Sequence, residues 1–207
     1  MLKQTTLLCI ALGMLTSCAS MDKSECLTAD WRTIGFEDGA KGKNETAISE
    51  YRQDCAKHGV APELTLYRQG HREGSERYCT RRNGFVVGKR GGGYQNSCAA
   101  DLEAGFLVGY NDGKALHDLQ RALSTANSAL QKQHRLVSDL AQSITAKKEL
   151  LVADGLVKDE RLAILADIEA LNIDLLDASQ QLPLLEREVR RAEHALAQAE
   201  QNLSDYY

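Results

Sequence analysis

Aromatic residues are scarce in this 207-residue chain, where they make up 5% of the sequence and include a single tryptophan. So few aromatic side chains are unusual for a large compact core, and the composition instead suits long helices rich in alanine, leucine, glutamine and glutamate. The length allows one or two domains. We therefore expect a mainly α protein.

A strong excess of one charge is also missing, because 25 Lys and Arg residues stand against 29 Asp and Glu residues. The net charge of −4 does not favour binding to a phosphate backbone, so nucleic acid is not an expected partner. The five histidines show no metal-ligand spacing. We expect no metal, no cofactor and no enzymatic activity.

The apolar run near the start of the chain, Leu7–Leu15, is too short to span a bilayer. With Lys3 before it and small residues after it, the run is typical of a signal peptide over residues 1–17. The ending Leu-Thr-Ser-Cys resembles the lipobox of bacterial lipoproteins, which implies a lipid on Cys18 and a lipidated linker over residues 18–24. Two or three acyl chains would anchor the protein stably to a membrane. The alternative is a plain secretory signal followed by a chance cysteine.

The residue after Cys18 bears on which membrane would hold the lipid. Ala19 stands there instead of aspartate. By similarity to the enterobacterial sorting pattern, this implies the outer membrane, with the chain facing the periplasm.

Cysteine is absent after Cys98, and Cys9 would leave with the signal peptide. The four that remain are Cys26, Cys55, Cys79 and Cys98. An even number in an oxidising compartment predicts disulfides. Three pairings are open, and the lower entropy of closing shorter loops favours Cys26 with Cys55 and Cys79 with Cys98. The rival interpretation, a four-cysteine zinc site, lacks any C-x-x-C pair.

The composition changes near Lys114. Nearly all glycines and all four of these cysteines lie before that residue, and a glycine-poor, strongly periodic stretch follows it. We therefore place a small disulfide-stapled, Gly-rich helical domain at residues 25–114 and a second region at residues 115–207.

An aromatic or apolar residue precedes Gly-x-x-x-Gly four times in the first region, at Gly35–Gly39, Gly70–Gly74, Gly88–Gly92 and Gly109–Gly113. Residues four apart share a helix face. Each glycine costs about 1 kcal/mol of helix propensity, so we expect a neighbouring backbone or ring to pack closely there.

Local signals predict where the short elements of this region begin and end. Thr28, Asn44 and Pro62 stand where helices would start. The glycines of Asn83-Gly84 and Gly91-Gly92-Gly93 indicate turns. Between those turns, Phe85–Val87 has the composition of a short extended piece.

The second region has apolar residues in alternating steps of three and four, from Leu116 to Leu151 and again from Val157 to Leu203. This spacing is typical of a coiled-coil seam. The break at Asp154-Gly155 predicts a long antiparallel helical hairpin with its turn near residues 152–158 and arms of roughly 55 Å.

Four residues stand out within this predicted hairpin. Pro183 lies inside the second arm and should kink it. Gln133, Lys147 and Arg161 interrupt the apolar seam, and we expect them to set its register.

The first region is similar to the DUF2799 family of bacterial lipoproteins, whose function is unknown, over about residues 25–130. The residues that carry the resemblance are Asp30–Gly42, Cys55, Tyr67–Gly70, Tyr78, Cys79, Gly88, Gly92, Tyr94, Cys98, Phe106 and Tyr110–Gly113. The resemblance implies export and lipidation, and it transfers no catalytic residue.

Polar residues offer two weaker candidate sites. His71 with Arg72, Glu73 and Asp38 could form a polar site, and a His71–Glu73 pair could do acid–base work, although exposed helix polarity explains these residues better. The second candidate is a basic group that could contact anionic headgroups, lipopolysaccharide phosphates or peptidoglycan carboxylates, with solvated charge as the alternative. Its members are Arg77, Arg81, Arg82, Lys89 and Arg90.

These observations favour a membrane-anchored envelope lipoprotein that acts as a structural or protein-interaction module. Its expected contacts are the membrane, through the lipid, and a protein partner or a second copy, through the hairpin. The alternative is a periplasmic binding module for peptidoglycan, anionic lipid or lipopolysaccharide.

Overall fold

The structure is a computed structural model, and it describes residues 21–206. The predicted signal peptide and the predicted lipid-bearing Cys18 lie outside the described residues. All secondary-structure elements in the described part of the chain are helices, and it contains no strand. In chain order its elements are α1 (Lys23–Thr28), α2 (Trp31–Ala40), η1 (Glu45–Ala47), α3 (Ile48–Ala56), α4 (Leu64–Tyr78), α5 (Arg81–Lys89), α6 (Ala100–Leu151), α7 (Lys158–Asn202) and η2 (Ser204–Tyr206), where η marks a short 3₁₀ helix.

The chain forms two compact units. Unit 1 contains the described residues up to Tyr78 together with Gln95–Ala99, and unit 2 contains Cys79–Tyr94 and the chain from Ala100 onward. The change of composition near Lys114 therefore falls inside α6, which continues through it without a break.

Unit 1 is built on a crossing of α2 and α4 through paired glycines. A Cβ atom placed on Gly70 would lie 1.8 Å from the carbonyl oxygen of Arg32, and one on Gly35 would lie 2.1 Å from the carbonyl oxygen of Tyr67. No side chain fits at such distances, so only glycine allows the two backbones to come this close. The close packing compensates for the poor helix propensity of glycine, as the Gly-x-x-x-Gly motif predicts.

Unit 2 repeats the same crossing between α5 and the start of α6. Here a Cβ atom on Gly109 would lie 1.9 Å from the carbonyl oxygen of Arg81, and one on Gly84 would lie 2.2 Å from that of Phe106. The glycine contacts of α2 and α4 thus recur position by position in α5 and α6.

Other contacts are repeated along with the glycines. Arg32 of α2 pairs with Glu73 of α4 at 2.8 Å, and Arg81 of α5 pairs with Asp112 of α6 at 3.7 Å. Tyr67 and Phe106, at matching positions of the two crossings, are both fully buried. Each unit therefore contains one copy of a glycine-packed helix pair.

Three local predictions are wrong. Asn83-Gly84 is not a turn and Phe85–Val87 is not extended, because α5 runs through all of these residues. Gly84 is helical because its close contact with α6 outweighs its low helix propensity, and the third glycine pair is consequently Gly84 with Gly88. Thr28 ends α1, and α2 is capped by Asp30, whose carboxylate accepts hydrogen bonds from two backbone N–H groups of the first turn.

The disulfide between Cys26 and Cys55, with a sulfur–sulfur distance of 2.02 Å, confirms the predicted pairing of these two residues. It lies in the core of unit 1 together with Trp31 and Tyr67. Cys79 and Cys98 are also in disulfide form. None of the four sulfurs is left as a thiolate ligand for zinc.

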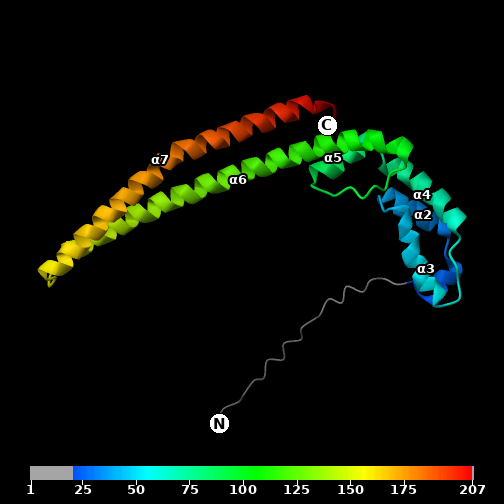
Figure 1. Cartoon of the computed structure of the whole chain (residues 1–207), viewed down its shortest axis with the longest axis horizontal. Helices are drawn as coiled ribbons and strands as arrows, with labels where there is room; N and C mark the ends of the chain where they lie inside the picture. Colours follow the sequence, from blue (N-terminus) through cyan, green and yellow to red (C-terminus); the bar gives the residue numbers. More distant parts are fainter. Residues whose placement is uncertain (1–20, 207) are drawn as a thin grey trace, which may run out of the picture. The chain divides into compact units, whose positions relative to one another are not determined.

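The hairpin consists of α6 with 52 residues and α7 with 45, which lie side by side in Figure 1 and are joined by residues 152–157. The buried hairpin residues all belong to the predicted seam, which confirms the long antiparallel helical hairpin. They are Leu116, Ile144, Ile164, Ile168, Ala178 and Val189. Within the part of the chain that the structure describes, no helix has both the length and the apolarity needed to cross a bilayer.

Three polar seam residues bind across the hairpin. Gln133 donates from its side-chain amide to the carbonyl oxygen of Ala178 at 2.9 Å. Lys147 forms an ion pair with Asp167 at 2.6 Å. Arg161, in the first turn of α7, donates to the free carbonyl of Leu151 at the end of α6. Each contact matches one position of α6 to one position of α7, as a residue that sets register would do.

The end of α7 is attached to the glycine-packed pair of unit 2 through Tyr206. The Tyr206 ring stacks on Phe85 with a centroid distance of 4.2 Å. Its hydroxyl accepts a hydrogen bond from Arg81 at 2.7 Å and donates one to Asp112 at 2.5 Å. Both ends of α7 are therefore held, and the helix continues through Pro183 between them.

Candidate functional site

A row of exposed apolar side chains lies on the face of α7 that points away from α6. We call this face the outer stripe, and its members are Leu162, Leu165, Glu169, Ile173, Leu176, Gln180, Leu184 and Arg187. Its five leucine and isoleucine side chains are 47–66% exposed. At 3.6 residues per turn, the outer stripe lies about 180° around α7 from the buried seam.

A helix with only one partner needs only one apolar face. In α7 one face is already covered by α6, so the outer stripe contributes nothing to the folding of the hairpin. More apolar surface is exposed near the turn, where Leu150, Val152 and Val157 are 50–78% exposed. Exposed apolar side chains gathered on one side of a helix are typical of an interaction site. The hairpin thus offers a second contact surface along one side.

Unit 1 contains a buried polar cluster around Asp38, whose side chain is almost fully enclosed. Its carboxylate accepts hydrogen bonds from the hydroxyls of Tyr51 and Tyr67, both at 3.0 Å, and forms an ion pair with Lys43 at 2.8 Å. A buried carboxylate is stable only with such partners. The matching position of the second glycine-packed pair is Val87, so this cluster is specific to unit 1.

His71 is buried beside this cluster, with its ring stacked on Tyr67 at 5.9 Å. Its Nε2 atom lies 2.8 Å from the carbonyl oxygen of Lys43, and because a carbonyl can only accept, this nitrogen donates. Glu73 lies on a different side of α4, where it is exposed and paired with Arg32. The structure therefore does not bring together the histidine and carboxylate of the acid–base alternative.

An open cavity of about 370 Å³, lined mostly by polar residues, borders His71 within unit 1. Arg68 and Arg72 contribute positive charge to its lining, and Glu45 pairs with Arg68 at 2.5 Å. The Ser97 hydroxyl, from a residue that is 8% exposed, has no hydrogen-bond partner among the described residues. A buried hydroxyl without a partner is uncommon in a native structure and fits a site that takes a polar ligand.

The predicted basic group is divided between the two ends of α5. Arg81 and Arg82 lie in the first turn of α5, while Lys89 ends that helix and Arg90 follows it. At 1.5 Å per residue the two ends are roughly 12 Å apart. Arg81 is engaged with Tyr206 and Asp112, and the Lys89 ammonium lies over the Phe85 ring at 5.8 Å.

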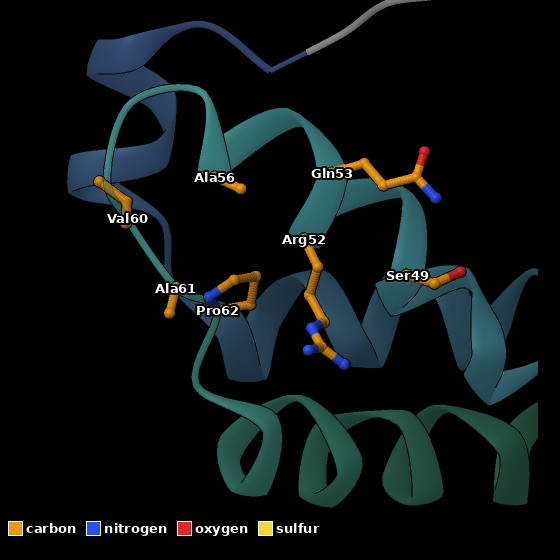
Figure 2. Close-up of a pocket in the computed structure, with 7 residues that line it drawn as sticks. All are labelled: Ser49, Arg52, Gln53, Ala56, Val60, Ala61 and Pro62. Atoms are coloured by element: carbon orange, nitrogen blue, oxygen red, sulfur yellow. The ribbon is translucent and has the colours of Figure 1, made fainter.

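Figure 2 shows a further open groove in unit 1, formed where α3 leads toward α4. Its volume is about 470 Å³, and its lining residues are Ser49, Arg52, Gln53, Ala56, Val60, Ala61 and Pro62. The Arg52 side chain extends from α3 toward the neighbouring helices (Figure 2). Arg52 is the only charged group in this lining, so the groove has no pair of groups for acid–base chemistry.

The polar cluster predicts that unit 1 loses stability at alkaline pH. Burial is the main cause that raises the pKa of the Tyr67 and Tyr51 hydroxyls, and the nearby Asp38 carboxylate raises it further. The hydrogen bond to Asp38 raises the pKa of Lys43. All three groups hold their protons more tightly in the folded state. The stabilisation contributed by these three groups should therefore be fully present below about pH 10. Above it, the free energy of unfolding should fall by up to about 1.4 kcal/mol per pH unit for each tyrosine, and by less for the half-exposed Lys43.

Urea unfolding followed by the fluorescence of Trp31, the only tryptophan, checks this prediction. Between pH 8 and pH 11 the midpoint should fall for the natural chain and should fall less for Tyr67→Phe. The same fall in both proteins would contradict the role given to Tyr67.

The geometry defines an all-helical, disulfide-stapled protein in which two glycine-packed helix pairs precede a long hairpin. Residues 30–115 match the model of a family described as Protein of unknown function (DUF2799). The matched region is similar to this family and contains both glycine-packed pairs. No curated protein and no solved structure matches the chain.

Proposed function

We propose that this protein is a membrane-anchored lipoprotein of the cell envelope that catalyses no reaction and whose hairpin binds another protein chain. The observation that carries the proposal is the outer stripe, where five large apolar side chains remain 47–66% exposed on a helix that is already packed on its other face. The four oxidised cysteines support an oxidising compartment outside the cytoplasm.

The anchor is supported by the lipobox-like ending at Cys18, with Ala19 after it favouring the outer membrane. Growth of cells on labelled palmitate tests it. The natural chain should incorporate the label and sediment with the outer membrane, whereas Cys18→Ala should do neither. An unlabelled natural chain that is recovered free of membranes would contradict the anchor.

Photocrosslinking in cells tests the interaction role. A photoreactive residue at Ile173, within the outer stripe, should give a discrete crosslinked product. The matched control is Ala163, which is exposed on the same helix but lies to the side of the stripe. Equal and diffuse capture at both positions would remove the basis of the proposal.

A second candidate function is a binding module for peptidoglycan, anionic lipid or lipopolysaccharide. The specific observation that favours it is the polar cavity beside His71, with Arg68 and Arg72 in its lining and the unpartnered hydroxyl of Ser97. Phosphate or carboxylate groups would suit this lining through charge-assisted hydrogen bonds.

Co-sedimentation with purified peptidoglycan, and separately with vesicles that contain anionic lipid, tests the second candidate. The chain with Arg68→Gln and Arg72→Gln should be retained at least five-fold less than the natural chain at low salt. The control Arg121→Gln, on the hairpin, removes a charge far along the sequence and should change nothing. No retention of the natural chain on either material would exclude this function.

A further inference from the structure

The spacing of the residues in the outer stripe is symmetric about its midpoint. Its eight positions follow one another in steps of 3, 4, 4, 3, 4, 4 and 3 residues from Leu162 to Arg187. The midpoint lies between Asp174 and Leu175. Around this midpoint four of the five large apolar positions mirror one another, since Leu165 mirrors Leu184 and Ile173 mirrors Leu176, while Leu162 mirrors Arg187.

We infer that the outer stripe binds the outer stripe of a second copy of this chain, with the two α7 helices antiparallel about a two-fold axis at this midpoint. This inference rests on the proposed interaction role of the hairpin and names its partner. A two-fold interface uses the same patch on both subunits, so its surface must be self-complementary.

The antiparallel arrangement matches side chains by type. Leu165 faces Leu184 of the second copy, and Ile173 faces Leu176 of the second copy, so the exposed apolar side chains cover one another. Glu169 faces Gln180 of the second copy, whose amide can donate to the carboxylate. At each end, Leu162 packs against the aliphatic stem of Arg187 while the guanidinium reaches water.

Charge selects this direction over the parallel one. A parallel pair in the same register would place Glu169 beside Glu169 and Arg187 beside Arg187 of the second copy. Like charges at directly facing positions oppose association. The antiparallel pair separates both sets, and the only acidic residue of the stripe then meets an amide.

The extent of the contact predicts its strength. At 1.5 Å per residue the stripe is about 38 Å long, and at the width of one helix the pair would bury roughly 800 Å² in total. Stable complexes bury roughly 1,200–2,000 Å². The dimer should therefore be weak and reversible in dilute solution, and confinement of both copies to a membrane would strengthen it through effective concentration.

Crosslinking between cysteine variants in membranes tests the direction and the register. Two differently tagged full-length chains carry Leu165→Cys and Leu184→Cys, and a short bismaleimide is added without reductant so that the native disulfides persist. The mixture should give a crosslinked dimer at least five-fold above either variant alone. In the antiparallel pair, two copies of position 165 are about 28 Å apart, beyond the reach of the reagent.

The matched control replaces Leu165→Cys with Ala163→Cys, which should crosslink weakly with Leu184→Cys. Crosslinking of Leu165→Cys with itself as readily as with Leu184→Cys would overturn the antiparallel arrangement. Photocrosslinking at Ile173 separates the two proposals. Capture of a different protein would overturn self-association and leave the interaction role in place, whereas capture of nothing would remove both.

Discussion

Replacing Gly70 with alanine will lower the free energy of unfolding of unit 1 by about 3 kcal/mol, because the new methyl group has no room. Its Cβ atom would lie 1.8 Å from the carbonyl oxygen of Arg32 and 2.9 Å from the backbone nitrogen of Phe36. Both are backbone atoms, so they cannot move aside by rotating a side chain. The helices α2 and α4 must separate, and the packing along their whole crossing is weakened.

Trp31 provides the measurement, since it begins α2 and is buried in unit 1. Its fluorescence in urea should show a markedly lower midpoint for Gly70→Ala. The control is Gly105→Ala, where nothing lies within 4 Å of the added atom and the residue is exposed in α6. That variant should leave the Trp31 transition unchanged and should favour the helix by about 1 kcal/mol locally. A Gly70→Ala protein as stable as the natural chain would contradict the close helix crossing.

Replacing Asp38 with alanine should cost about 3 kcal/mol, the second large effect. The carboxylate accepts hydrogen bonds from the hydroxyls of Tyr51 and Tyr67, and hydrogen bonds to charged groups contribute about 1.5–3 kcal/mol each. Its removal leaves the Tyr67 hydroxyl buried without this acceptor and Lys43 without its ion-pair partner. Part of the loss is recovered because Lys43 is half exposed and water can solvate it.

Glu37→Ala is the matched control, one residue earlier on α2. Glu37 is exposed and pairs with Lys41 at 3.1 Å within the same helix, a contact that contributes about 0.5 kcal/mol or less. The Trp31 transition should shift for Asp38→Ala and barely move for Glu37→Ala. Equal shifts in the two variants would show that Asp38 is not the centre of the cluster.

Two parts of the fold could be predicted from the sequence because they depend on local periodicity. The 3-4 spacing of apolar residues predicts the hairpin, and the buried seam residues such as Ile144 and Ile164 all follow it. The glycine spacing predicts close packing, although the partner of each glycine pair comes only from the structure.

Helix α5 could not be predicted from its turn and propensity signals because tertiary contacts override them. Gly84 and Gly88 disfavour a helix in isolation, and Asn83-Gly84 is typical of a turn. In the structure, close backbone contact with α6 compensates for the glycines. Periodicity could have found this helix, since Gly84 and Gly88 repeat the four-residue spacing of Gly35 and Gly39.

The Asp38 cluster and the outer stripe could not be predicted from the sequence alone, for different reasons. The sequence predicts a polar site that contains Asp38 and His71, but the partners of Asp38, Tyr51 and Tyr67, come from other helices and share no local pattern with it. The outer stripe had a signal in the sequence, since Ile173 and Leu176 are large apolar residues outside the seam. Only the placement of α6 shows that their face is uncovered.

We expect another chain to cover the outer stripe when the protein is on its membrane. The direct measurement is the rate of maleimide labelling of Ile173→Cys and of Ala163→Cys in intact envelope membranes and in dilute purified protein. We expect Ile173→Cys to react at least ten-fold more slowly on membranes than in dilute solution, with Ala163→Cys equally reactive in both. Equal rates for Ile173→Cys on membranes and in dilute solution would contradict the account.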